Sequence, residues 1–406
     1  MAGTLSSLEE AKALDAEDSL RQFRSHFDLP NGVIYLDGNS LGPPPREALE
    51  RLAHTAGIEW KRDLITSWNK ADWINLPKTC GARIAKLIGA NADDVIVADS
   101  VSVNIFKLAS AIWKKTPGAI AYIKGEFPTD GYILQGLSEL TGAALSRLQQ
   151  DDPSALNDEI SVLVKSVVHY KTAAVADIAA WEEAAARKDV SIIWDLSHAA
   201  GVLDINLKKA GARFAVGCGY KFLNGGPGAP AYVYVDGAIA NDLHQPLSGW
   251  MGHAKPFDFS DTYEPAPGVE RFACGTPPIL SLSAMDAALE IFESASMAAI
   301  EAKAAALGDL FLVRSKHLGL ESISPPAGER RGGHISLTHP HGYEIVQAMI
   351  ARGVIGDFRA PNIMRFGFSA LYTRFEDIWR ACNILEDILK KEIWRDLAYA
   401  QRHTVT

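Results

Sequence analysis

The chain has 406 residues, of which 48% are hydrophobic and 22% charged, and this composition excludes disorder as its main state. Single domains usually end near about 250–300 residues, so the length predicts one large and one smaller unit. The formal net charge of −9 argues against broad binding to nucleic acid or to an anionic membrane, because both need basic surfaces.

The cysteines and the N-terminal region indicate a reducing compartment. The four cysteines are far apart and form no C-x-x-C pair, which predicts neither a metal site nor a disulfide framework. The first twenty residues lack the pattern of a signal peptide, and no stretch approaches the ~18 apolar residues of a membrane-spanning helix. We therefore expect a cytoplasmic protein with no membrane segment.

The N-terminal elements are predicted to be helical with one short strand. Residues 4–28 are typical of a polar amphipathic helix, and residues 33–36 of a strand. Residues 37–45 are dense in turn formers and predict a loop, after which residues 46–60 predict a helix with Pro45 near its first turn.

From about residue 84, short apolar runs alternate with amphipathic stretches. The predicted strands lie at 95–98, 119–123, 161–168, 190–194, 214–217 and 231–235. The predicted helices between them lie at 102–113, 131–141 and 178–188. This alternation indicates an α/β fold with a mostly parallel sheet covered by helices.

The C-terminal part predicts a smaller α+β unit. Residues 256–278 read as an irregular connection, residues 280–307 as one long helix, and residues 363–368 as a strand. Thr373 and Glu376 fit a capping box for a last helix with an apolar stripe. The expected domains are a large unit over 51–280 and a small unit over 281–406, with residues 1–50 packing on the small one.

Lys221 is the first candidate for chemistry. It follows an apolar strand and precedes a glycine-rich turn. A lysine set among apolar residues loses its proton more easily, and a neutral amine is what Schiff-base chemistry requires. From this segment alone, a lysine that caps the strand and reaches solvent is the more common alternative.

Asp195 strengthens the functional interpretation. It ends the apolar run 190–194, and ligands in open α/β sheets bind at the carboxyl ends of strands. A lysine and a carboxylate on neighbouring strand ends suit pyridoxal phosphate (PLP), whose aldehyde needs an amine and whose pyridine nitrogen needs an acid. An ordinary helix cap at Asp195 is an equally good alternative.

Two further segments are suited to a phosphorylated, planar cofactor. Ser102 lies between a predicted strand and helix, where unpaired N–H groups favour a phosphate, although an ordinary serine cap is at least as common. Phe127 follows another predicted strand and can stack on a flat ring, although such an aromatic more often belongs to the core.

Taken together, the motifs resemble those of kynureninases, which belong to the PLP-dependent transferase fold type I group. The matching segments include YLDGNSLGP (35–43), SWN (67–69), DSVSVN (99–104), FPTD (127–130) and HYKT (169–172). They continue with WDLSHAAG (194–201), GYKFLNGGPG (219–228), GWMGH (249–253), RFACGTPPIL (271–280) and IMRFGFSALY (363–372). They follow one another in family order over roughly residues 33–372.

The resemblance implies a role for each matching residue. Lys221 would carry the cofactor as a Schiff base, Asp195 would pair with its ring nitrogen, and Tyr220 would act as a proton donor. The other implied cofactor contacts are Val101, Ser102, Phe127, Pro128, Thr129, Asp130, Ser166, His198, Trp250 and Thr276, the last two from a second subunit. The implied substrate contacts are Arg365 for the α-carboxylate, Trp68, Gly275 and Thr276 for the aryl ring, and Asn39 and Ser40. Position 101 is Val where relatives often have Thr, so a phosphate contact there would use the backbone alone.

The implied reaction is hydrolytic cleavage of the Cβ–Cγ bond of L-kynurenine, and of 3-hydroxykynurenine, to anthranilate or 3-hydroxyanthranilate and L-alanine. The enzyme would be a homodimer of the kynurenine pathway, in tryptophan catabolism or NAD biosynthesis. Two alternatives are another fold type I enzyme, such as a cysteine desulfurase using Cys274 or an aminotransferase, and a cofactor-binding protein without activity.

Overall fold

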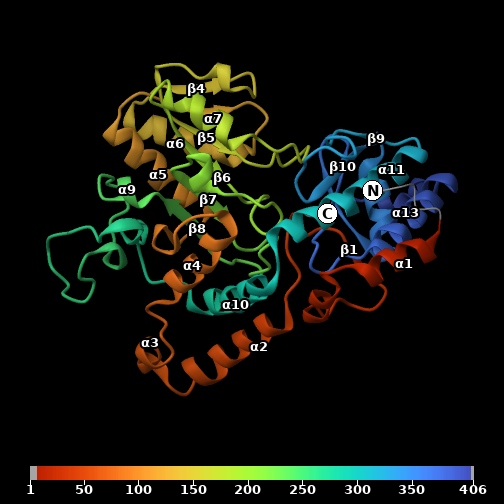
Figure 1. Ribbon diagram of the computed structural model, residues 1–406, viewed down its shortest axis with the longest axis horizontal. Coiled ribbons are helices and arrows are strands. Elements are labelled where there is room, and N and C mark those ends of the chain that lie inside the picture. Colours follow the sequence, from red (N-terminus) through yellow and green to blue (C-terminus); the bar gives the residue numbers. More distant parts are fainter. Residues whose placement is uncertain (1–6, 404–406) are drawn as a thin grey trace.

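The computed structural model describes residues 7–403 and contains two units (Figure 1). The larger unit is built on a seven-stranded sheet with the order β2-β8-β7-β6-β5-β3-β4. Its strands are β2 (Val95–Val97), β3 (Ala119–Ile123), β4 (Leu145–Leu148), β5 (Ile160–Ser166), β6 (Ser191–Asp195), β7 (Phe214–Cys218) and β8 (Ala231–Val235). Only β8 runs against its neighbours, which confirms the mostly parallel α/β sheet.

Helices cover both faces of this sheet because the central strands are buried on both sides. One layer holds α5 (Val101–Lys115) and α6 (Pro128–Thr141). The other holds α4 (Leu76–Ile88), α7 (Ile178–Ala186), α8 (Leu207–Ala210) and α10 (Ile279–Glu290). Ile193 and Trp194, adjacent on β6, point into different layers, as strand geometry requires.

The smaller unit is an antiparallel sheet covered by helices. The strand order is β12-β13-β10-β9, with β9 (Glu321–Ser322), β10 (His334–Thr338), β12 (Asp357–Arg359) and β13 (Ile363–Gly367). The helices are α11 (Met297–His317), α12 (Gly342–Ile350) and α13 (Phe375–Lys390). Ile378, Cys382 and Leu385 of the predicted stripe are fully buried, and Leu389 is half-buried.

The N-terminal segment lies against the C-terminal one. Figure 1 shows α1 (Leu8–Glu17) beside the blue end of the chain, where it contacts α13. Strand β1 (Ile34–Tyr35) pairs in parallel with β11 (Val354–Ile355). The chain then crosses to the large unit through α2 (Arg46–His54), which continues as a π-helix over Thr55–Trp60 and ends near α3 (Ser67–Lys70).

Two predicted helices differ from the structure. The first helix stops at Glu17, because Asp18 turns extended, accepts the N–H of Leu20 and pairs with Lys303; a 3₁₀ turn follows over Arg21–His26. Residues 1–6 of that prediction lie outside the described residues. The helix predicted over 280–307 is two helices, because Ala295 is extended and Ser296 begins α11. The sequence analysis also missed β4, whose Leu145 is exposed at the sheet edge.

The cap of α13 also differs from the prediction. The N-cap residue is Arg374 instead of Thr373, and the Arg374 N–H donates to the Asp377 carboxylate at 2.9 Å. Asp15 of α1 accepts the N–H groups of Phe375 and Glu376 at 2.7 and 2.9 Å. A cap supplied by a residue about 360 positions away cannot be read from the local pattern.

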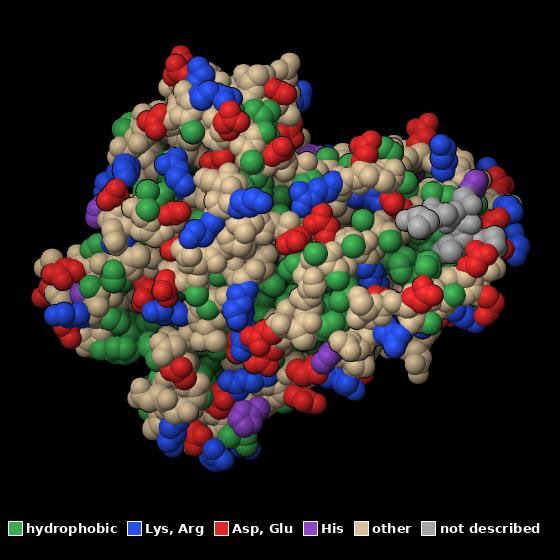
Figure 2. Space-filling view, viewed as in Figure 1, with side chains coloured by type: hydrophobic (Ala, Val, Ile, Leu, Met, Phe, Trp, Pro, Cys, Tyr) green, Lys and Arg blue, Asp and Glu red, His purple; other side chains and the backbone are tan. Residues whose placement is uncertain are grey.

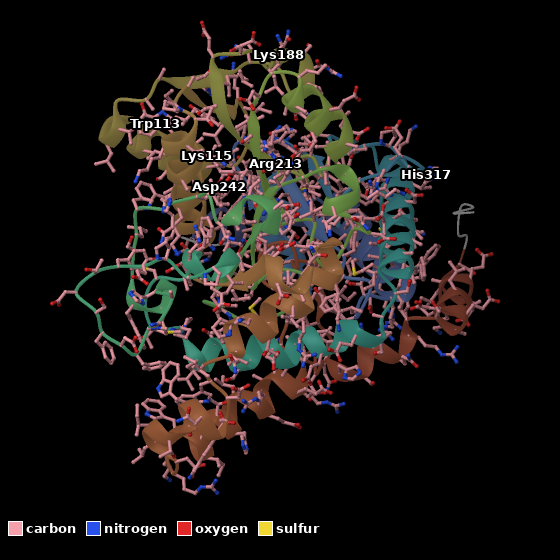
Figure 3. The ribbon with its side chains drawn as sticks, turned by 60° about the vertical axis from the view of Figure 1, so that its left-hand side comes forward. Trp113, Lys115, Lys188, Arg213, Asp242 and His317 are labelled. Carbon is pink, nitrogen blue, oxygen red and sulfur yellow. The ribbon has the colours of Figure 1, made fainter. Side chains whose placement is uncertain are left out.

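Polar contacts close the amino ends of the strands, at the edge opposite the candidate site (Figure 3). Trp113 donates to the carbonyl of Gly118 at 3.1 Å, Lys115 pairs with Asp242 at 2.8 Å, and Arg213 donates to Ser191 at 3.2 Å.

Acidic and basic side chains alternate over the described residues of the face in Figure 2 and form no basic stripe there. Within residues 7–403, no helix has the length and apolarity needed to cross a membrane.

Candidate active site

The carboxyl ends of the parallel strands surround a cavity of about 200 Å³. Ten of the predicted cofactor residues line it: Val101, Ser102, Phe127, Thr129, Asp130, Ser166, Asp195, His198, Tyr220 and Lys221. Ser166 and Asp195 are the last residues of β5 and β6, and the others lie in the segments that follow β2, β3, β6 and β7. The parallel sheet therefore brings all ten to one edge.

A tight turn holds Lys221 at the end of β7. The N–H of Gly225 donates to the carbonyl of Gly219 at 2.8 Å and closes the loop that carries the lysine. A Cβ on Gly42 would lie 2.2 Å from the carbonyl oxygen of Lys221, so only glycine lets the N-terminal loop lie against this backbone. Lys221 Nζ lies 2.9 Å from His198 Nε2.

His198 is held as a neutral imidazole. Burial, with the positive charge of Lys221 as the next cause, lowers the pKa of His198 well below its usual range. Its other nitrogen, Nδ1, is buried and has no hydrogen-bond partner among the described residues. A neutral histidine accepts a hydrogen bond from Lys221 without adding a second positive charge to the cavity.

Two carboxylates face the same cavity and differ in their surroundings. Asp195 is 7% exposed and accepts the N–H of Ser197 at 2.8 Å. Asp130 is buried in the first turn of α6, and burial together with the charge of Asp195 raises its pKa well above the usual value. Oδ2 of Asp130 has no partner among the described residues, so it can accept a hydrogen bond from a polar ligand atom or donate one to it.

The N-terminus of α5 forms another wall of the cavity. Ser100 begins this helix and accepts the N–H of Val103 at 3.3 Å, which leaves the first-turn N–H groups of Val101 and Ser102 directed to the cavity end of the helix. Asp99 adopts a left-handed conformation, and the buried Lys107 bonds both its carboxylate and the carbonyl of Phe272, the latter at 2.6 Å. These contacts hold the turn in place.

Arg365 lies behind this cavity on β13. Its Nη1 donates at 2.7 Å to the carbonyl of Tyr170. Tyr170 also lines the cavity, and its ring packs edge-on against that of Phe127, with 5.4 Å between the ring centroids.

The predicted Ser40 and Asn39 lie near Arg365 or its strand. Ser40 donates to Asp357 at 2.7 Å and lies 3.4 Å from Arg365. Asn39 is fully buried against Gly367, and neither atom of its amide has a partner among the described residues.

Besides Arg365, Asn39 and Ser40, five predicted residues lie outside the cavity of Lys221. Pro128 is exposed at the start of α6. Trp68 packs against Trp73, and Trp250 against Phe257 and Phe259. Gly275 and Thr276 line a separate cavity of about 250 Å³ beside Asp99.

Sequence reasoning missed other residues that line the site. Tyr170, Ser197 and Cys218 contribute to the wall, and Asp357 holds Arg365. Tyr170 lies within the matching HYKT segment, which was a signal that could have found it. Asp357 lies on a short strand whose partner is decided by sheet register, and no local pattern indicated it.

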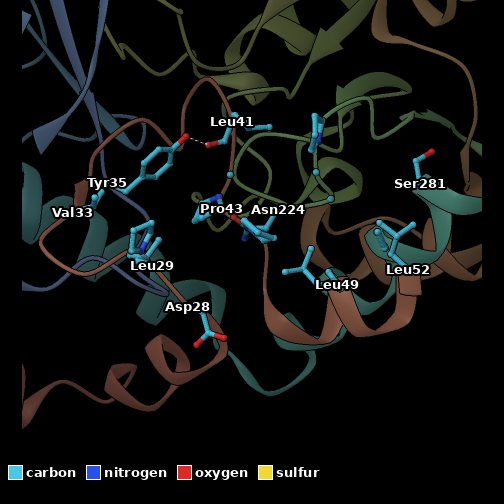
Figure 4. Close-up of a pocket in the computed structure, with 18 of the residues that line it drawn as sticks. Asp28, Leu29, Val33, Tyr35, Leu41, Pro43, Leu49, Leu52, Asn224 and Ser281 are labelled. Carbon is cyan, nitrogen blue, oxygen red and sulfur yellow. Dashed lines mark hydrogen bonds between the residues drawn. The ribbon is translucent and has the colours of Figure 1, made fainter. Parts of the chain in front are cut away.

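A third, apolar cavity of about 560 Å³ lies beside the N-terminal loop (Figure 4). Leu29, Leu41, Pro43, Leu49 and Leu52 line it, and Tyr35 donates to the carbonyl of Leu41 at 2.7 Å. Its lining holds none of the predicted catalytic groups. The smaller, polar cavity of Lys221 is therefore the candidate active site.

Known proteins are similar to this chain in sequence and in fold. Residues 300–385 match the family model described as "Kynureninase C-terminal domain". The kynureninase of Burkholderia mallei (strain SAVP1) is 46% identical, covering 98% of this chain and 99% of that protein, and the kynureninase of Pseudomonas fluorescens is 41% identical, covering 99% and 100%.

Solved structures with the same fold are more distant in sequence. A C-DES variant with glycine covalently linked to its PLP cofactor has a TM-score of 0.80 at 17% identity, covering 90% of this chain and 99% of its own. The cysteine desulfurase of Thermococcus onnurineus NA1 has a TM-score of 0.78 at 19% identity, covering 91% and 98%. These likenesses show a shared fold, whereas the full-length identities above show the family. The chain belongs to the kynureninase family.

Proposed function

We propose that this protein is a PLP-dependent hydrolase that cleaves the Cβ–Cγ bond of L-kynurenine to give anthranilate and L-alanine. The observation that carries the proposal is one cavity that joins Lys221 to His198, Asp130 and Asp195 in a chain of the kynureninase family. We extend the substrates to 3-hydroxykynurenine, which yields 3-hydroxyanthranilate.

The residues present fit PLP. The N-terminus of α5 offers N–H groups at Val101 and Ser102 for a phosphate, and the ring of Phe127, 45% exposed, offers a flat surface to stack on. Asp130 Oδ2 and His198 Nδ1 are buried atoms that lack partners in the described structure, and a ligand with polar atoms satisfies both. When bound, PLP supplies an electron sink for carbon–hydrogen and carbon–carbon cleavage next to the substrate amine.

The protein's own residues then handle the protons. Lys221 would hold the cofactor through Nζ and would take the proton from the substrate Cα, and neutral His198, 2.9 Å away, accepts a hydrogen bond from Nζ. Asp195 would pair with the ring nitrogen of the cofactor. Burial, with Cys218 as the next contributor, raises the pKa of Tyr220, so its phenol keeps a proton that it donates at the substrate Cβ.

Arg365 binds the substrate α-carboxylate through its planar fork, with Ser40 and Asn39 beside it. Oδ1 and Nδ2 of Asn39 are both buried without a partner among the described residues, which supports a substrate contact. The aryl ring of the substrate lies against Trp68, Gly275 and Thr276.

We further propose a homodimer in which each subunit completes its partner's site. Trp68, Trp250, Gly275 and Thr276 lie away from the cavity of Lys221, on segments that carry exposed apolar side chains such as Phe259, 74% exposed. A partner subunit brings these residues to the cavity. We place the enzyme in the cytoplasm, in tryptophan catabolism or NAD biosynthesis; the four cysteines, all free, are consistent with a reducing compartment.

We keep the division into a large domain over 51–280 and a small domain over 281–406, with residues 1–50 joining the small one. The pairing of β1 with β11 and the contact of α1 with α13 support this assignment.

Product analysis tests the function. Protein loaded with PLP is mixed with L-kynurenine, and anthranilate fluorescence and L-alanine are measured; we expect equal amounts of both. Lys221→Ala should be inactive, and Lys209→Ala, at an exposed lysine on α8, should retain full activity. Transfer of the amino group to a keto acid would indicate an aminotransferase, and sulfide from cysteine a desulfurase.

Borohydride reduction with peptide mapping tests the site separately. The reduced cofactor should be found on the peptide that contains Lys221. A label on any other lysine would contradict the assignment of the site even if anthranilate is released.

A further inference from the structure

Asp357 forms an ion pair with Arg365 inside the small sheet. The two residues face each other across the antiparallel strands β12 and β13, and they are 1% and 2% exposed. An Arg–Asp pair this deeply buried is costly to desolvate, so its geometry needs to be close to ideal for it to persist. No local sequence motif predicts this pairing, which depends on the register of the two strands.

The carboxylate of Asp357 holds the guanidinium along one edge. Nε of Arg365 donates to Oδ1 at 2.8 Å, and Nη2 donates to Oδ2. On another edge, Nη1 donates to the carbonyl of Tyr170 at 2.7 Å. The plane of the fork is therefore fixed in two directions.

Part of the fork stays available for a ligand. A guanidinium has five N–H groups, and these bonds use one each on Nε, Nη1 and Nη2. The remaining contact of Nη2, with Ser40 Oγ, is long at 3.4 Å. Nη1 keeps one N–H, and Nη2 keeps one that is engaged only by this long contact, so each nitrogen can still donate to an oxygen of an incoming carboxylate.

The local charge around Arg365 favours binding of an anion. Arg359 also contacts Oδ2 of Asp357, at 2.8 Å, so two guanidinium groups share one carboxylate. Burial opposes ionisation of Asp357, but the hydrogen bonds and charge of Arg365, followed by the charge of Arg359, outweigh it and hold its pKa below the usual value. Arg359, Arg365 and Asp357 together carry a net charge of about +1, which one substrate carboxylate neutralises while the nearby Asp37 is protonated. Burial, and then the charge of Asp357, raises the pKa of Asp37 to about 7, so Asp37 reduces this positive charge at higher pH.

We propose that Asp357 is a positioning residue, which orients Arg365 so that the free end of its fork receives the α-carboxylate of the substrate. The inference rests on the proposed function, because that function makes Arg365 the carboxylate-binding residue. Asp357 itself touches neither substrate nor cofactor. Its contribution is to substrate affinity and not to the bond-breaking step.

The test compares KM with kcat in Asp357→Asn and Asp357→Glu. Asparagine turns an N–H donor toward the donors of Arg365, so the fork loses its orientation. We expect KM for L-kynurenine to rise about 10- to 100-fold, with kcat within about twofold of the wild type, because a charged hydrogen bond is worth that range of affinity. The glutamate variant keeps the charge and should show a smaller rise.

A substrate analogue without the α-carboxylate separates positioning from general damage. The decarboxylated amine of kynurenine should inhibit the wild type and both variants with the same Ki. Asp309→Asn serves as a matched control, since it breaks the pair of Asp309 with the buried Arg331 away from the active site; it should leave KM unchanged.

Each outcome decides the inference. An unchanged KM in the folded variants overturns it, and so does an equal loss of affinity for the amine; if the asparagine variant does not fold, the glutamate variant alone gives the decision. If the wild type releases no anthranilate, the proposed function fails. In that case the affinities for L-alanine and for ethylamine, compared in the same proteins, still decide the role of Asp357.

Discussion

At the scale of residues, burial shifts the pKa values of three groups around Lys221. The pKa of His198 is lowered, so the imidazole is neutral, whereas the pKa values of Asp130 and Tyr220 are raised. Desolvation is the largest cause in all three cases, and it acts in opposite directions because it always disfavours the charged form. The cavity thus contains a neutral imidazole beside the lysine and a phenol that keeps its proton.

Tyr220→Phe tests the proton donor. Removing the phenol proton while keeping the ring should lower kcat by ~10²–10⁴-fold, the usual contribution of a positioned acid. The variant should still bind PLP, which its absorption spectrum reports. A kcat equal to that of the wild type would remove Tyr220 from this role.

Asp37→Asn tests a second carboxylate near the substrate arginine. Burial, and then the charge of Asp357, raises the pKa of Asp37 to about 7, with Arg365 and Arg359 opposing the shift. Below pH 7 Asp37 is neutral and the net positive charge near Arg365 persists; above pH 7 its negative charge cancels that charge. KM for L-kynurenine should therefore rise as the pH passes 7 in the wild type.

The asparagine variant should lack this rise in KM, because its side chain does not titrate. KM is measured between pH 6 and 8 in both proteins. Parallel pH profiles would show that Asp37 does not control substrate affinity.

At the scale of elements, strand ends and helix starts bring the site together, and distant residues hold those elements. The turn into α5 depends on Lys107, and the loop of Lys221 depends on the contact with Gly42. On the far side of the sheet, Glu182 of α7 accepts the Nε1–H of Trp194 on β6 at 2.7 Å. This bond fixes α7 on the strand that ends in Asp195.

Glu182→Gln should change how stability depends on pH. Burial raises the pKa of Glu182 from 4.5 to about 7, so the folded state favours the protonated form. Its contribution to stability is complete below pH 4.5 and is lost as the pH rises through 7. The loss amounts to about 3 kcal/mol in the free energy of unfolding.

Glutamine accepts the same hydrogen bond and does not titrate, so the variant should gain stability relative to the wild type between pH 4 and pH 8. Calorimetric melting curves at the two pH values measure the change. Equal differences in Tm at both values would contradict the assignment.

At the scale of the whole molecule, the described chain places its candidate aryl-binding residues and its lysine in different cavities. Lys221 lines one, and Gly275 and Thr276 line another. Both cavities border the segment 99–100 at the start of α5, so a second subunit on this side can reach the first site. This arrangement is the reason for proposing a homodimer.

Subunit complementation tests the shared site. Lys221→Ala and Trp250→Ala should each be inactive or nearly so alone. After unfolding and refolding together, about a quarter of all sites should combine an intact Lys221 with the partner's intact Trp250 and regain activity. Sedimentation should show a species of about twice 43.9 kDa. No recovery of activity in a mixed dimer would place Trp250 outside the partner's site.

The sequence by itself determined the alternation of strands and helices and the segments that carry Lys221, Asp195, Asp130 and Phe127, because these depend on short-range periodicity and turn chemistry. The family motifs extended this to Arg365 and His198. Local patterns gave the wrong end for the first helix and the wrong cap for α13, because distant partners such as Lys303 and Asp15 compete with local preference. They also did not indicate the break at Ala295. Only the tertiary structure decided that Asp357 lies opposite Arg365 and that His198 lies beside Lys221, because strand register and chain crossing bring these pairs together.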